Sequence, residues 1–167
     1  MKKEKFLTIF AVFDDKTQSI LDTYQKQVFE LGYTGEQTMG LPFHITLGSF
    51  PTEDEAMLTN KVRETSKKYQ AFDIDLIKTN DFNNKVLFIE PKINEELLQL
   101  HKIFDNNYAN GFPWHPHATI YYGEKNEVIK AKAMLDNIFK PIKAKIVGIQ
   151  MGEFFPTRMI IKEALKI

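Results

Sequence analysis

The chain has 167 residues, a length that suits one compact domain or two small lobes sharing a core and excludes two large independent domains. Lysine plus arginine and aspartate plus glutamate both total 22, so the formal net charge is zero, which argues against a long nucleic-acid partner. The 43% hydrophobic content predicts a globular protein, and the lack of cysteine excludes disulfides, thiolate catalysis and cysteine-ligated metals.

The apolar segments of the sequence are short. None approaches the ~18 uninterrupted apolar residues that a membrane-spanning helix requires. The run at 6–13 follows several lysines but lacks the length and the small-residue cleavage site of a signal peptide, so it is better interpreted as a strand. We therefore expect a cytoplasmic protein, monomeric and without a membrane partner.

The first half of the chain predicts the element order β-α-β-α-β-β. Asp14 and Asp15 mark a helix start, and Thr52 with Glu55 matches a capping box. Segments rich in β-branched and aromatic residues predict the strands, and apolar residues three and four apart predict the helices. The expected strands are 5–13, 43–50, 71–78 and 85–90, and the expected helices are about 15–31 and from Pro51 to about 70.

The second half repeats part of this order. We expect a helix at about 93–108, a strand at 117–123, a helix at about 125–139 and final strands near 143–151 and 157–163. If the strand at 85–90 opens this half as the strand at 6–13 opens the first, the chain contains a weak internal duplication.

Two copies of one short motif lie on predicted strands. His44-Ile45-Thr46-Leu47 and His117-Ala118-Thr119-Ile120 each carry a histidine, a threonine two residues later and then an aliphatic residue. Side chains alternate across a strand, so each histidine and its threonine project to the same face. If the halves pack around a pseudo-two-fold axis, the two faces converge on one cleft.

Such a cleft suits a phosphodiester. Displacement at phosphorus needs a base for the incoming oxygen and an acid for the departing one, and histidine titrates near neutrality. The threonine hydroxyls can donate to the non-bridging oxygens without any metal. The residues alone do not decide which histidine is the acid.

The segments FHITLG and PHATIYYG resemble the paired signature of the two-histidine phosphoesterases, which include 2'-5' RNA ligase-like proteins and 2',3'-cyclic nucleotide phosphodiesterases. The resemblance covers nearly the whole chain. It implies an α+β fold with a duplicated β-α-β scaffold, in which two antiparallel sheets face a central cleft and helices lie outside. It also implies that His44 and His117 are catalytic and that Thr46 and Thr119 hold the phosphate.

We accordingly expect residues 1–167 to form a single bilobal domain. Its first lobe covers about 1–84 and its second about 85–167, and strands can be exchanged between the lobes. No cofactor is expected.

Aromatic residues flank both motifs. Phe43, Phe112 and Trp114 are candidates for stacking a nucleobase, with ordinary core packing as the alternative. Tyr121 lies an even number of residues from His117 and is expected on the catalytic face, whereas Tyr122, at odd spacing, is expected on the opposite face.

Two further polar residues have alternative interpretations. His115 is expected to line the cleft mouth, although His44, His115 and His117 together could instead ligate a metal. Arg158 could reach the cleft and bind phosphate, or simply face solvent.

The sequence thus predicts a metal-independent phosphoesterase acting on 2',3'-cyclic phosphate or 2'-5' phosphodiester bonds of RNA ends or small nucleotides. Because the same acid and base can catalyse the reverse reaction, the prediction also includes 2'-5' RNA ligation. The alternatives are a nucleotide or RNA-end binding protein without turnover, and a metallohydrolase built on the three histidines.

Overall fold

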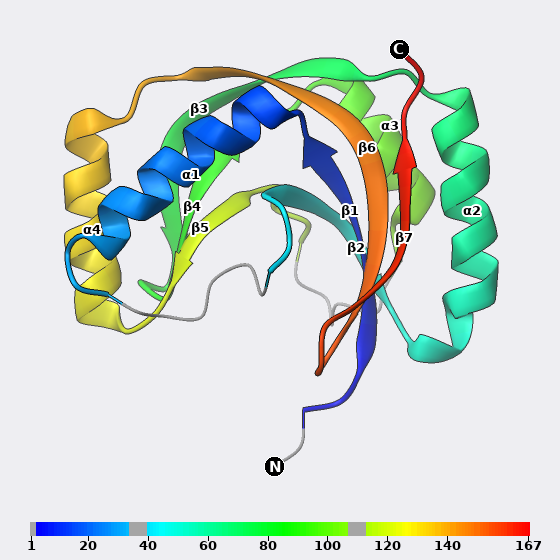
Figure 1. Cartoon of the computed structure of the whole chain (residues 1–167), viewed down its shortest axis with the longest axis horizontal. Helices are drawn as coiled ribbons and strands as arrows, with labels where there is room; N and C mark the ends of the chain where they lie inside the picture. The colour runs from blue at the N-terminus through cyan, green and yellow to red at the C-terminus, as the bar shows by residue number, and fades with distance from the viewer. Residues whose placement is uncertain (1–2, 34–39, 107–112) are drawn as a thin grey trace.

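The computed structural model describes residues 3–33, 40–106 and 113–167, which form an antiparallel sheet with helices packed against it (Figure 1). The α+β class is therefore confirmed. The elements follow in the predicted order: β1 (Phe6–Phe13), α1 (Asp15–Phe29), β2 (His44–Phe50), η1 (Thr52–Asp54), α2 (Glu55–Lys68), β3 (Phe72–Phe82), β4 (Val86–Pro91), α3 (Glu95–Phe104), β5 (Ala118–Tyr122), α4 (Lys125–Ile138), β6 (Ile142–Phe154) and β7 (Arg158–Ala164).

Local sequence signals explain several element ends. The Asp14 side chain accepts a hydrogen bond from the Thr17 amide at 3.1 Å and so caps α1, as predicted. The predicted capping box does not form. Residues Thr52–Asp54 first make a 3₁₀ turn, and Glu55 at the start of α2 bonds Arg158 instead.

The expectation of two facing sheets is wrong, because the strands form one seven-stranded sheet in the order β2-β1-β6-β3-β4-β5, with β7 paired to β6. The long strand β6 is the reason. Its residues 142–146 pair with β3, and its residues 148–153 pair with β7 along the same edge. Its other edge pairs with β1 over residues 146–154, so that β6 joins the two ends of the sheet.

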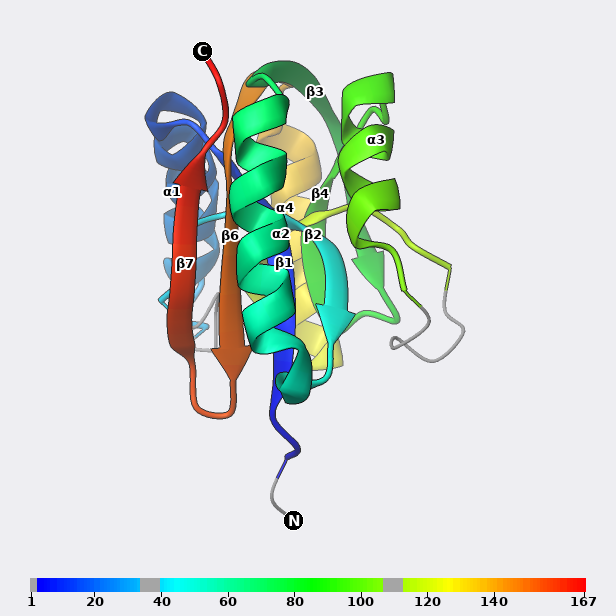
Figure 2. The same cartoon turned by 90° about the vertical axis from the view of Figure 1, so that its right-hand side faces the viewer.

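The helices lie outside an arched sheet (Figures 1 and 2). Helices α2 and α3 pack against β2, β6 and β7, whereas α1 and α4 pack against β3, β4, β5 and β6. The main hydrophobic core lies between helices and sheet, and β1 contributes Leu7, Ile9, Ala11 and Phe13 to it. The alternate residues Phe10 and Val12 belong to a separate cluster with Leu41, on the side of the sheet away from the helices, which we call the inner face.

Among the described residues, no helix is long and apolar enough to cross a membrane.

Candidate active site

The two histidine motifs lie on the two end strands of the sheet. His44 is the first residue of β2, and His117 immediately precedes β5. Although β2 and β5 stand at opposite ends of the strand order, they contact each other because the sheet is arched. Burial is the main cause that lowers the pKa of His44, and the charge of His117 adds to the lowering, which places the two rings within electrostatic reach of each other.

Each histidine ring makes the same hydrogen bond. Nδ1 of His44 lies 2.8 Å from the Pro42 carbonyl oxygen, and Nδ1 of His117 lies 2.7 Å from the His115 carbonyl oxygen. Since a carbonyl only accepts, Nδ1 carries the hydrogen in both rings. The neutral rings therefore keep the lone pair on Nε2, the nitrogen available for proton transfer.

Both rings are held in the neutral form. Burial lowers the pKa of His44 to about 4, partly opposed by the hydrogen bond to Pro42. Burial also lowers the pKa of His117, again opposed by its backbone hydrogen bond, and the charge of His115 adds to the lowering. Because the charge of His117 opposes protonation of His44, the arrangement favours a pair that carries one proton at most.

A matching aromatic ring supports each motif. The strand register pairs Phe10 with Thr46 and Phe88 with Thr119. The Phe10 ring centroid lies 4.4 Å from that of His44, and the Phe88 centroid lies 5.0 Å from that of His117. Both phenylalanines are fully buried and exclude water from one side of each imidazole.

Sequence reasoning missed these two phenylalanines. The internal duplication was the available signal, because it already matched the strand that carries Phe10 to the strand that carries Phe88. The cross-strand register was needed to place each ring beside a histidine.

On its other side, each of the two phenylalanines is paired with a residue that carries an amide side chain. Gln150 on β6 pairs with Phe10, and Asn80 on β3 pairs with Phe88. The two amides differ in their bonding. Asn80 Oδ1 accepts the Asp81 amide at 2.8 Å, whereas the buried Oε1 of Gln150 finds no hydrogen-bond partner among the described residues.

The expectation that Tyr121 shares the face of His117 is wrong. The β4–β5 pairing passes from Phe88–Thr119 to Leu87–Tyr121, so one extra residue, Ile120, interrupts the alternation. Tyr121 is consequently fully buried in the main core and donates its hydroxyl to Glu127. Tyr122, 53% exposed, takes the place on the inner face that was expected for Tyr121.

Phe43 and Trp114 both have partners inside the protein. Phe43 is buried in the main core. The Trp114 indole stacks on the His101 ring at 3.7 Å between centroids, and its Nε1 donates to the Thr46 carbonyl at 2.9 Å. One face of the indole is thus unavailable to a nucleobase. Phe112 lies outside the described residues.

Arg158 does not reach the histidines. Its guanidinium bonds the carboxylate of Glu55 at the start of α2, and its Nε lies 3.3 Å from Glu153 Oε1. These two carboxylates hold the side chain on the helix side of the sheet, so the expectation of an arginine in the cleft is wrong.

His115 contacts aromatic rings beside His117 and a carboxylate. Its Nε2 lies 2.5 Å from Glu90 Oε1, and Lys78 Nζ lies 3.1 Å from Glu90 Oε2. Its ring also packs edge-on against Phe82 and Phe88, which both touch His117. Across the described parts of the chain, no three histidine, aspartate or glutamate side chains are grouped so as to hold a metal ion.

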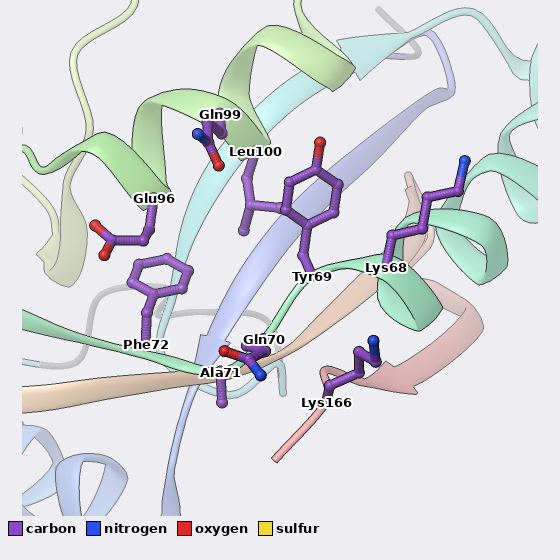
Figure 3. A pocket seen from close by; sticks show the side chains of 9 residues that line it. All are labelled: Lys68, Tyr69, Gln70, Ala71, Phe72, Glu96, Gln99, Leu100 and Lys166. Atoms are coloured by element: carbon purple, nitrogen blue, oxygen red, sulfur yellow. The ribbon is translucent and has the colours of Figure 1, made fainter.

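A pocket of about 350 Å³ lies away from these residues, between the C-terminal end of α2 and the helix α3 (Figure 3). None of the sequence-predicted site residues lines it. Its walls are Lys68, Tyr69, Gln70, Ala71, Phe72, Glu96, Gln99, Leu100 and Lys166.

Known proteins resemble this chain in sequence and in fold. Residues 21–153 match the family model described as the 2'-5' RNA ligase superfamily. No curated protein sequence matches the chain significantly.

Several solved structures share the fold. Escherichia coli LigT in its apo form has a TM-score of 0.65 at 16% sequence identity, covering 98% of both chains. The LigT complex with 3'-AMP has a TM-score of 0.63 at 12% identity, covering 99% of this chain and all of the other. TT0787 of Thermus thermophilus has a TM-score of 0.61 at 14% identity, covering 96% of this chain and 98% of that one.

Proposed function

The chain belongs to the 2'-5' RNA ligase superfamily, and on this premise we propose that it is a phosphoesterase acting on 2',3'-cyclic phosphate or 2'-5' phosphodiester bonds of RNA ends or small nucleotides. The observation that carries the proposal is the identical hydrogen bond at both motifs, from Nδ1 to the carbonyl two residues earlier. In both rings this bond keeps a hydrogen on Nδ1, so that each Nε2 is available to take or to give a proton.

The two rings can share the proton transfers of hydrolysis. His44, whose pKa is lowered to about 4, is neutral at pH 7 and takes the proton of the attacking water at Nε2. His117 enters protonated and gives its Nε2 proton to the departing ribose oxygen. Binding of an anionic phosphate favours this protonated form, since an opposite charge raises a histidine pKa.

The threonines complete the site. Thr46 and Thr119 project to the same face as the histidines, and their hydroxyls donate to the non-bridging phosphate oxygens. The mechanism needs no metal. Run backwards, the same transfers join a hydroxyl to a cyclic phosphate, which is 2'-5' ligation.

Independent grounds support a nucleotide as the substrate. Solved structures of LigT carry ATP, 3'-AMP, NADP+ and phosphate, in a fold that this chain shares along nearly its whole length. We extend nucleotide binding to this chain as part of the proposal.

The test offers 2',3'-cyclic nucleotides, 2'-5' dinucleotides and RNAs with cyclic ends to the protein in the presence of a chelator, and identifies each product. We expect turnover that falls at least ~100-fold in H44A and in H117A. The double variant is expected to lose little more than either single variant, because acid and base act in one step.

Two results would contradict the proposal. Nucleotide binding without turnover by the unmodified protein would favour a binding protein. Turnover that disappears with the chelator and returns with added metal would favour the metallohydrolase. Thermal unfolding of each variant serves as the control for correct folding.

A further inference from the structure

Strand β1 begins beside the end of β6 and the β6–β7 turn, at the lower end of Figure 1, and three phenylalanine rings of these segments are in contact. The Phe6 and Phe154 rings are stacked, with their centroids 5.2 Å apart and an angle of 29° between their planes. The Phe155 ring centroid lies 5.8 Å from that of Phe6. All three side chains are partly exposed, and none is part of the main core. We call these three residues the aromatic tip.

Lysines accompany the aromatic tip. A cavity of about 530 Å³ is lined by Lys3, Lys5, Phe155 and Pro156. Lys3 Nζ lies 4.8 Å above the Phe155 ring, and the Lys5 side chain is 55% exposed with Nζ 3.8 Å from Glu153. Exposed aromatic rings beside lysines are the combination that binds single-stranded nucleic acid, by stacking bases and neutralising phosphates.

The backbone of Phe155 supports a role other than stability. Its φ is 71°, in the left-handed region that a bulky side chain adopts only at an energetic cost. Glycine or asparagine would make this turn more easily. A phenylalanine here places a large aromatic surface at the edge of a cavity.

The aromatic tip is connected to His44 through the buried cluster of the inner face. Phe154 packs against the inner-face cluster that contains Phe10, and the Phe10 ring touches His44. Phe6 and Phe10 are four residues apart on β1 and project to the same face, so they lie about 14 Å apart. That is the length of about four stacked nucleotides at ~3.4 Å each.

A buried hydrogen-bond acceptor lies beside Phe10 on the inner face. Gln150 pairs with Phe10 and so projects to the inner face, where its buried Oε1 lacks a partner among the described residues. A buried acceptor without a partner destabilises the protein until a donor reaches it. Nucleobase amino groups and ribose hydroxyls are such donors.

We infer that the aromatic tip, with Lys3 and Lys5, binds a single-stranded RNA segment whose 3' end lies at the two histidines. The inference rests on the proposed function and names its substrate as an RNA oligonucleotide. A 2',3'-cyclic phosphate occupies the 3' end of an RNA, so every other nucleotide extends in the 5' direction, along the inner face toward the tip. Lys3 then leaves the Phe155 ring for a phosphate, and a base takes its place.

The test compares kcat/KM for substrates of one, two, four and six nucleotides, each ending in a 2',3'-cyclic phosphate. We expect kcat/KM to rise at least ~5-fold from one to four nucleotides, the smallest gain that one stacked base supplies, and to change little from four to six. The F155L variant keeps the apolar volume of the side chain but removes its π-face. In this variant, the ratio of kcat/KM for the tetramer to kcat/KM for the mononucleotide is expected to fall toward one. In K3Q/K5Q the salt dependence of the tetramer reaction is expected to weaken.

The control for F155L is F29L, which changes an exposed phenylalanine at the end of α1 and is expected to keep the tetramer-to-mononucleotide ratio of kcat/KM. The control for K3Q/K5Q is K67Q/K130Q, which changes two exposed lysines on α2 and α4 and is expected to keep the salt dependence of the unmodified protein. Equal kcat/KM at all lengths, or a rise that F155L leaves intact, would overturn the inference while the proposed function stands. If no substrate turns over, the proposed function fails. Binding of a labelled RNA hexamer with a 3'-phosphate is then measured. Weaker binding by F155L than by the unmodified protein supports RNA binding at the aromatic tip, and equal binding overturns it.

Discussion

The His115 imidazole and the Glu90 carboxylate are bonded through Nε2 and Oε1 at 2.5 Å, two residues before His117. Lys78 approaches the other carboxylate oxygen at 3.1 Å and helps to lower the pKa of Glu90. The bond fixes the residue whose carbonyl receives the hydrogen of His117 Nδ1. We therefore expect Glu90 to position His117 without touching it.

Replacing Glu90 tests this positioning. In E90Q the charge-assisted bond to His115 is weakened, so the segment that orients His117 loosens. We expect kcat to fall about 10-fold with little change in KM, and the acidic limb of the pH–rate profile to move. Steady-state kinetics across pH provide the measurement. The control is E64Q, at an exposed carboxylate on α2, and kinetics of E90Q that match those of E64Q would exclude the role.

The lowered pKa of His44 makes stability depend on pH. A histidine in the unfolded chain titrates near 6.5, but His44 in the folded protein titrates at about 4. Between these values the unfolded state binds the proton and the folded state does not, so the free energy of unfolding falls as pH falls. Above pH ~6.5 both states are neutral and the contribution is fully present.

Urea unfolding of the wild type and H44Q at pH 7.5, 6, 5 and 4.5 measures this effect. We expect the stability difference between the two proteins to be constant above pH ~6.5 and to shift against the wild type by up to about 3 kcal/mol toward pH 4. Burial also lowers the pKa of His117, but His117 is present in both proteins, so only its repulsion of a protonated His44 differs between them. A difference that stays constant over the whole range would show that His44 is accessible to protons in the folded state.

Gly48, in the first motif segment, allows helix α3 to approach β2 closely. A Cβ at this position would lie 2.1 Å from the Phe104 carbonyl oxygen, which is backbone and cannot rotate away. We therefore expect G48A to reduce the free energy of unfolding by about 3 kcal/mol, since α3 must move. The matched control is G152A, whose Cβ would meet the Arg158 carbonyl oxygen at an ordinary 3.6 Å. Equal urea midpoints for the two variants would contradict the close packing.

Trp114 links the two motif segments, because it lies three residues before His117 and donates Nε1 to the Thr46 carbonyl at 2.9 Å. In W114F this bond is lost and the Thr46 carbonyl loses its donor, which we expect to cost about 1 kcal/mol of stability. Turnover is also expected to fall, since the segment that carries His117 is less firmly held to β2. Y122F, at an exposed tyrosine, is the stability control. Unchanged stability and turnover in W114F would mean that the link is unimportant.

The sequence by itself determined the element order and the two histidine–threonine pairs. These features are local: hydrophobic period distinguishes helix from strand, and alternation places residues two apart on one face. The cap at Asp14 was predicted for the same reason, because its bond to the Thr17 amide spans only three residues.

Only the tertiary structure decided the features that depend on pairing between distant strands. The extra residue at Ile120 turns Tyr121 into the core and Tyr122 onto the inner face, and strict alternation cannot foresee it. Strand β6 joins what looked like two sheets, because one strand can pair with different partners along its length. Arg158 is bound by Glu55, which lies 103 residues away in the chain, and Phe10 and Phe88 reach the histidines only through cross-strand register. Such contacts depend on which strands become neighbours, and the period of a single segment carries no information about its neighbours.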